Sequence, residues 1–112
     1  MSKAKILIAA LDSKARIVSF NDYAQWLTGY TKSEAIGKNW FDLLIHPKDT
    51  DMVMEVFNGL FNGEETYWDF VNDIVLKDKT KVEVRWSNAI LRDADGKAEY
   101  VYSSGTLTKN KF

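Results

Sequence analysis

Residues 20–49 read FNDYAQWLTGYTKSEAIGKNWFDLLIHPKD, and this stretch decides the fold. Glycine and proline divide it into several short helical pieces, although one smooth helix would pack more simply. Asn21 is a typical N-cap for the first piece, and Gly29 is a natural end to it. Thr31 begins a second piece, because Glu34 follows three residues later and completes a capping box. We therefore expect a wall of short helices here.

The helical pattern continues beyond this pair of helices but is interrupted twice. Gly37 ends the second helix, residues 39–45 (NWFDLLI) can add another helical turn, and Pro47 interrupts the chain. One long helix then covers residues 49–63, with its apolar side chains on a single stripe. That stripe consists of Val53, Val56, Phe57, Leu60 and Phe61.

Short strands precede and follow the helices. Residues 6–11 (ILIAAL) and 16–20 (RIVSF) are separated by the polar turn DSKA, which predicts a hairpin. Later in the chain the apolar period changes from 3.6 to 2, so residues 67–77 and 81–91 are predicted as half-buried strands whose even positions face the core. The turn DADG then leads into a last strand over residues 99–108.

Composition limits the function before any motif does. The chain has 112 residues, of which 46% are hydrophobic, so residues 1–112 can form a single domain with a core. A formal net charge of −1 without a long basic stretch makes nucleic acid an unexpected partner. The longest apolar run, ILIAAL, is far below the roughly 18 residues of a membrane helix, so we expect no membrane contact and a cytoplasmic location. Without cysteine there is neither a disulfide nor a thiolate ligand.

The segments LD…IVSFN, LTGYTKSEAIGKNW and HPKD, followed by W…LRDADG and a closing strand, resemble a PAS domain, a small sensory module of signalling proteins. The resemblance covers residues 6–108, and its most specific part is the block N…LTGY…E.IGK. It implies an α+β fold in which a five-stranded antiparallel sheet curves around a pocket, with several short helices and one longer helix over one face. In such a fold, a helical wall broken at Gly29, Gly37 and Pro47 can bend over a cavity that one straight helix would fill.

The sequence departs from the PAS pattern in its turns and at its end. The first hairpin turn lacks the glycine that many members carry, and Lys79 stands where glycine is usual in the turn KDKT. Residues 106–108 read TLT, without the aspartate through which many members couple to an effector, so coupling of that kind is not expected. Only five residues precede the first strand, which predicts an excerpt of a longer multidomain signalling protein.

Haem and a photoactive flavin are not expected as cofactors, and the cofactor is otherwise unknown. His46 is the only histidine, and it stands directly before Pro47, where a histidine commonly caps a helix. A flavin photosensor of the related type has cysteine after the asparagine of a GxNC motif, whereas Trp40 follows Asn39 here. The acidic runs DADG and DTDMVME are interpreted as a hairpin turn and a helix N-terminus, and no metal site is predicted.

The chain itself is not expected to be an enzyme. One histidine cannot support a convincing Ser-His-Asp arrangement, and there is no glycine loop for phosphate.

Two asparagines on the inward strand faces are the main candidates for ligand binding. A turn centred near Lys79 makes paired residue numbers sum to 158, which places Asn72 opposite Trp86 and makes Asn88 its diagonal neighbour. Buried amides need partners, so the two could grip one small polar molecule, or protein groups and water could satisfy them instead. The remaining members of the predicted site are Trp86, Trp40, Asn39 and Ser103.

The other tryptophans are assigned by strand parity. Trp68 stands at an even, inward position like Trp86, so the core is its expected place, whereas Trp26 can equally lie on the surface.

The opposite face of the sheet is predicted to be a contact surface. If the last strand alternates as its neighbours do, it turns Tyr100 and Tyr102 outward beside Val71 and Val75. An apolar patch on a face that should meet solvent often marks an interface. We expect a homodimer or a docked helix there.

The resemblance to PAS domains implies a sensory module whose pocket occupancy changes the packing of the sheet and shifts an effector, expected to be a histidine kinase, between two states. One alternative is a ligand-free PAS module for dimerisation or protein interaction in a diguanylate cyclase or a transcriptional regulator. Another is a small α+β enzyme that uses a buried carboxylate.

Overall fold

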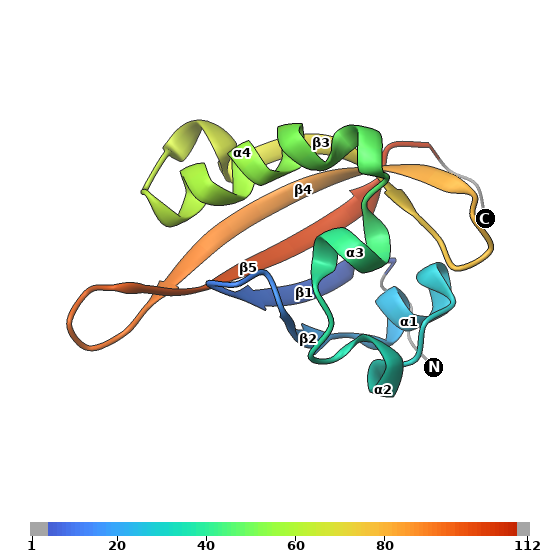
Figure 1. Ribbon diagram of the computed structural model, residues 1–112, viewed down its shortest axis with the longest axis horizontal. Coiled ribbons are helices and arrows are strands. Elements are labelled where there is room, and N and C mark those ends of the chain that lie inside the picture. The colour runs from blue at the N-terminus through green and yellow to red at the C-terminus, as the bar shows by residue number, and fades with distance from the viewer. Residues whose placement is uncertain (1–4, 110–112) are drawn as a thin grey trace.

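A computed structural model describes residues 5–109 of the chain (Figure 1). The strands are β1 (Leu7–Asp12), β2 (Ile17–Phe20), β3 (Asp69–Val75), β4 (Lys81–Arg92) and β5 (Ala98–Leu107). The α-helices are α1 (Asp22–Thr28), α2 (Lys32–Ala35), α3 (Trp40–Leu44) and α4 (Thr50–Phe61), and the 3-10 helices are η1 (Pro47–Asp49) and η2 (Glu65–Trp68). The predicted order of elements and the single long helix are confirmed.

The five strands form one antiparallel sheet in the order β2-β1-β5-β4-β3. Figure 1 shows α4 running along β3 and β4, while α1, α2 and α3 gather near β1 and β2. The hairpin between β4 and β5 extends beyond the helices. The last strand in the sequence is therefore the middle strand of the sheet.

The short helices begin at the caps that the sequence predicts. Asn21 accepts the N–H of Ala24 at 3.0 Å and also that of Ile8 in β1, so one side chain starts α1 and holds it to the sheet. Thr31 and Glu34 form the complete capping box of α2. These local bonds explain why the helix starts could be located from sequence alone.

The breaks between the helices allow the backbone to bond to the sheet. Gly37 N donates to Ile17 O at 2.8 Å, Ile17 N donates to Lys38 O at 2.9 Å, and Trp40 N donates to Ala15 O at 2.9 Å. A continuous helix would use these groups internally and could not bond to β2. The interruptions thus fix the helical wall against the edge of the sheet.

The core lies between this wall and the inward face of the sheet. Phe20, Leu44, Ile74 and Val84 have at most 1% of their surface exposed. The predicted stripe of α4 faces the core, and four of its five side chains are buried while Phe61 is partly buried. Within residues 5–109 no helix is long and apolar enough to cross a membrane.

The register of β3 and β4 corrects the prediction by two residues. Asn72 pairs with Val84, and Trp86 pairs with Phe70, so paired numbers sum to 156. Asn72 is therefore not opposite Trp86, and Asn88 is not its diagonal neighbour.

The turn explains this difference. Leu76 and Thr80 are still bonded, with 2.8 Å between Leu76 N and Thr80 O, and Lys79 N donates to Leu76 O at 2.9 Å. Lys79 itself has a φ of 77°, in the left-handed region. The loop is thus a three-residue turn that ends in a left-handed residue, a common hairpin type.

The prediction that Trp68 lies in the core is wrong. Its side chain is 50% exposed, because the chain forms η2 at this point and enters β3 only at Asp69. The strand parity that buries Trp86 therefore does not extend to Trp68. Trp26 on α1 is 62% exposed.

Candidate functional site

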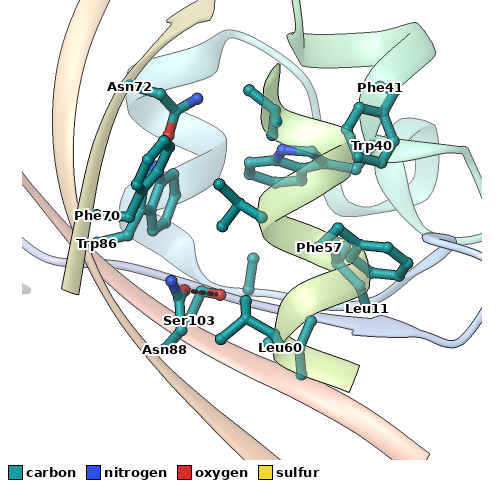
Figure 2. Close-up of a pocket in the computed structure, with 14 residues that line it drawn as sticks. Leu11, Trp40, Phe41, Phe57, Leu60, Phe70, Asn72, Trp86, Asn88 and Ser103 are labelled. Atoms are coloured by element: carbon teal, nitrogen blue, oxygen red, sulfur yellow. Dashed lines mark hydrogen bonds between the residues drawn. The ribbon is translucent and has the colours of Figure 1, made fainter. Parts of the chain in front are cut away.

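A small cavity lies between the helices and the inward face of the sheet (Figure 2). Its volume is about 60 Å³, which is enough to hold ordered water. The lining comes from α3, α4 and every strand except β2. It consists of Ala9, Leu11, Trp40, Phe41, Val53, Val56, Phe57, Leu60, Phe70, Asn72, Trp86, Asn88, Val101 and Ser103.

Aromatic side chains form much of the cavity wall. The rings of Trp40 and Trp86 meet edge to face, with centroids 5.6 Å apart. Gly105 on β5 allows this arrangement, because a Cβ at that position would lie 2.7 Å from Cε3 and Cζ3 of Trp86. Phe41 and Phe57 make a second edge contact at 5.9 Å. The apolar wall is therefore held by ring contacts between α3, α4 and the sheet.

Asn88 is bonded on both sides of its amide. It pairs with Ser103 across β4 and β5, and Ser103 Oγ donates to Asn88 Oδ1 at 2.6 Å (Figure 2). Asn88 Nδ2 donates to the backbone oxygen of Tyr67 in η2 at 2.9 Å. The side chain of Asn88 thus joins η2, β4 and β5. Both of these hydrogen bonds go to protein groups, as the alternative interpretation of a protein-satisfied amide predicted.

Asn72 is buried, with 7% of its surface exposed, and only part of its amide is bonded. Its Nδ2 donates to Asp73 O at 2.9 Å, while its Oδ1 forms no hydrogen bond with the residues that the structure describes. Every described side-chain nitrogen or oxygen that is sealed from water has a partner. The unbonded oxygen is therefore accessible to water, and Asn72 lines the cavity.

The structure brings five of the six predicted site residues together and leaves Asn39 outside. The amide of Asn39 caps α3, where its oxygen accepts the N–H groups of Phe41 at 2.9 Å and Asp42 at 3.3 Å. Its Nδ2 donates to Lys14 O at 3.3 Å. Because the capping role occupies this side chain, it is absent from the cavity lining.

The cavity is electrically neutral, since no charged residue is among the described residues that line it. Tyr67 stands in the neighbouring η2, and its hydroxyl donates to Glu55 at 3.2 Å. Desolvation raises the pKa of Tyr67, and the negative charges of Glu55 and Glu64 act in the same direction. Within residues 5–109 no group of three or more His, Asp or Glu side chains could hold a metal ion.

Family membership follows from the sequence as well as the fold. Residues 2–103 match the family model described as the PAS fold. This chain belongs to the PAS family. PAS domains are sensory modules and are generally not catalytic. No curated protein matches this PAS domain.

Three solved structures show how widely this PAS fold is shared. The PAS domain of the RpfR quorum-sensing receptor from Cronobacter turicensis, in complex with C12:0, is 22% identical with a TM-score of 0.79, over 97% of this chain and 99% of that one. A PAS domain from Colwellia psychrerythraea is 18% identical with a TM-score of 0.82, over 96% and 90%. The Cycle PAS-B domain from Drosophila melanogaster, with bound ethylene glycol, is 12% identical with a TM-score of 0.76, over 90% and 98%.

His46 caps a helix in this PAS domain. Its Nδ1 accepts the N–H of Lys48 at 3.0 Å at the start of η1, with Pro47 in the first helical turn. The predicted capping role is confirmed.

The outer face of the sheet is divided, which corrects the expected single patch. Val71 pairs with Arg85, and Arg85 pairs with Thr106, so Val71 is separated from Tyr102 along β5. Arg85 also binds both carboxylate oxygens of Asp69, at 2.7 and 3.1 Å. Val71 therefore lies among charged side chains, and it does not contact the two tyrosines.

The other half of this face carries three exposed apolar side chains. Ile8, Leu91 and Tyr102 are 40%, 47% and 44% exposed, and we call these three residues the outer apolar patch. Ala10 is on β1, where it pairs with Tyr102 of β5 on one side and with β2 on the other. The patch thus spans β1, β5 and β4.

Sequence reasoning missed much of the apolar lining, including Phe41, Leu11 and Val101. An apolar residue that faces a cavity follows the same pattern as one that fills the core, so no local signal separates them. The stripe of α4 could have identified Phe57 and Leu60, because it faces the strands that carry the asparagines.

Proposed function

We propose that this PAS domain is a sensory module that binds a small molecule in its cavity and relays occupancy to an effector, which we assign as a histidine kinase. The observation that carries the proposal is a neutral cavity in which Asn72, Asn88 and Ser103 stand among aromatic side chains. The C12:0 complex of the RpfR PAS domain supports it by analogy of fold. Membership of a longer signalling protein and a cytoplasmic location belong to the same proposal.

The bonds of Asn88 suggest how occupancy would be relayed. A ligand that competes for Ser103 or Asn88 changes the bonding between η2, β4 and β5. Because β5 is hydrogen-bonded to both β1 and β4, a shift at Ser103 alters the packing of the whole sheet. The sheet is then in equilibrium between a packing with the Asn88–Ser103 bond and a packing without it. A ligand can shift that equilibrium only by the difference between its binding free energies for the two packings.

Native mass spectrometry with an absorption spectrum of the purified protein tests this function. We expect a retained small molecule and a colourless protein, with retention lost in Asn72→Leu. The control is Asn58→Leu, which changes an exposed residue of α4 outside the cavity.

A Soret band or a flavin spectrum that survives desalting contradicts the expected absence of haem and photoactive flavin. Equal retention in wild type and Asn72→Leu contradicts the assignment of the cavity.

The second candidate function is ligand-free dimerisation. Two observations favour it: the cavity is small compared with the roughly 300–1,000 Å³ of most ligand sites, and the three side chains of the outer apolar patch are each at least 40% exposed. A second copy of the chain is the proposed partner, because a two-fold axis brings the same patch of both copies together.

Sedimentation equilibrium of two lysine variants tests the dimer. Tyr102→Lys places charge in the outer apolar patch and should weaken association about tenfold or more, since a buried unpaired charge costs several kcal/mol. Val71→Lys is the matched control, because Val71 is similarly exposed at 43% but lies on the charged half of the same face. A wild-type protein that stays monomeric at high concentration overturns this candidate.

A further inference from the structure

We propose that the cavity selects small uncharged molecules that donate hydrogen bonds, such as alcohols and primary amides, over acids and over molecules that only accept. This inference rests on the proposed function, because it assigns the chemical class of ligand to the same cavity. It follows from which polar atoms of the lining remain available after the internal hydrogen bonds are made.

The orientation of the Asn88 amide is fixed by a backbone carbonyl. The oxygen of Tyr67 can only accept a hydrogen bond, so the group 2.9 Å from it must be the NH₂ of Asn88. The amide oxygen then faces Ser103 and takes the hydroxyl hydrogen at 2.6 Å. Ser103 Oγ has no further hydrogen to donate and offers the cavity only its lone pairs.

A second carbonyl orients Asn72 in the same way. The backbone oxygen of Asp73 accepts from Nδ2 of Asn72 at 2.9 Å, which leaves Oδ1 as the unbonded atom. Asn72 is 93% buried, by difference from its 7% exposure, and it lines the cavity. In Figure 2 it lies on the other side of Phe70 and Trp86 from the bonded pair of Asn88 and Ser103.

The cavity therefore presents two acceptor oxygens, Asn72 Oδ1 and Ser103 Oγ, to any occupant. A hydroxyl or an amide N–H can bond to them, whereas an ether, ketone or carboxylate oxygen can only repel them. The oxygen of such a donor ligand can in turn accept from the indole N–H of Trp40 or Trp86, neither of which has a hydrogen-bond partner in the described chain. Molecules that both donate and accept are thus the best match.

Charge and size narrow the class further. A carboxylate or an ammonium group would lose its hydration without meeting an opposite charge, because the described lining contains no ionisable side chain. A volume of about 60 Å³ admits only a few non-hydrogen atoms unless side chains move.

Four molecules of equal heavy-atom count separate these chemistries: acetamide and 2-propanol donate, while acetone and acetate only accept. Each is titrated into ¹⁵N-labelled protein, and backbone and side-chain amide shifts of the cavity residues give the affinity. We expect acetamide and 2-propanol to bind about fivefold more tightly than acetone, the effect of one net hydrogen bond. Acetate should produce no shifts in the cavity.

Variants then assign the preference to its atoms. Asn72→Leu should reduce the acetamide-to-acetone ratio to less than about twofold, which is the loss of that one bond. Asn72→Ala provides the same test, with the same expected ratio, if Asn72→Leu does not fold, and Asn58→Leu should retain the wild-type ratio. Acetone or acetate binding in the cavity as tightly as acetamide overturns the assigned class but leaves the cavity as a ligand site. If none of the four shifts a cavity residue, both this inference and the proposed ligand site fail.

Discussion

Within residues 5–109, two residues other than glycine hold a left-handed backbone: Ala15, with a φ of 62°, and Lys79, with a φ of 77°. Both stand in hairpin turns. The left-handed region costs a residue with a Cβ about 1–2 kcal/mol, and the surrounding hydrogen bonds maintain it. Ala15 is also buried, so its methyl group contributes to the core, whereas Lys79 is exposed and gains nothing comparable.

Lys79→Gly should therefore stabilise the protein. Relief of strain exceeds the added flexibility of the unfolded chain, and we expect the free energy of unfolding to rise by about 0.5–1 kcal/mol. Urea denaturation measures the change. Lys79→Ala is the control, because it removes the charge but keeps the Cβ, and it should bring no gain. A midpoint for Lys79→Gly that is no higher than that of wild type counts against this account.

At the scale of elements, α4 and η2 are packed through a glycine. A Cβ on Gly59 would lie 2.5 Å from Cδ2 of Tyr67, so the ring rests directly on the helix backbone. The hydroxyl of the same tyrosine reaches Glu55, and its carbonyl holds Asn88. Gly59 thus positions the whole connection between the long helix and β3.

Gly59→Ala should destabilise the fold although alanine is the better helix former. Displacing the ring of Tyr67 costs about 1–3 kcal/mol, against a gain in helix propensity of about 1 kcal/mol. Thermal and urea unfolding should show a net loss. The exposed neighbour provides the comparison, since Asn58→Ala gains propensity without a clash. Equal or greater stability of Gly59→Ala would show that Tyr67 moves aside without cost.

The elements that sequence predicts well are those fixed by local chemistry. The starts of α1 and α2 depend on Asn21 and Thr31, each bonded to a residue three positions away. The register of β3 and β4 was missed because it depends on whether Lys79 accepts a left-handed conformation. Lysine has no intrinsic preference for the left-handed conformation, so the hydrogen bonds of the complete hairpin impose it on Lys79.

For the whole molecule, Asn88 matters more than its single position suggests. It connects η2 to the two longest strands, whereas the one hydrogen bond of Asn72 goes to its own neighbour, Asp73. The parity of the strands predicted that both asparagines face inward. It could not predict their partners, because Tyr67 approaches Asn88 only in the assembled fold. Asn39 was misplaced for a related reason, since its type suits a cap as well as a ligand.

Asn88→Leu should accordingly destabilise the protein more than Asn72→Leu. The first variant leaves the carbonyl of Tyr67 and the hydroxyl of Ser103 without their partner, at a cost of about 1–3 kcal/mol. The second removes one local bond and should cost about 1 kcal/mol or less. Urea unfolding of the unliganded proteins compares them. Equal losses would mean that the bonds of Asn88 do not hold the segments together.

The position of β5 has a consequence for synthesis of the chain. Before Ala98–Leu107 emerges from the ribosome, β1 can pair only with β2, and β3 only with β4. Isolated two-stranded ribbons are marginally stable in water, so neither half can wait in a folded state. Translation at roughly 5–20 residues per second therefore delivers a nascent chain that exposes both inward faces until the final strand is inserted between them. A ribosome that stalls within the turn DADG would hold a chain with every core side chain synthesised except those of β5, yet with no sheet to bury them.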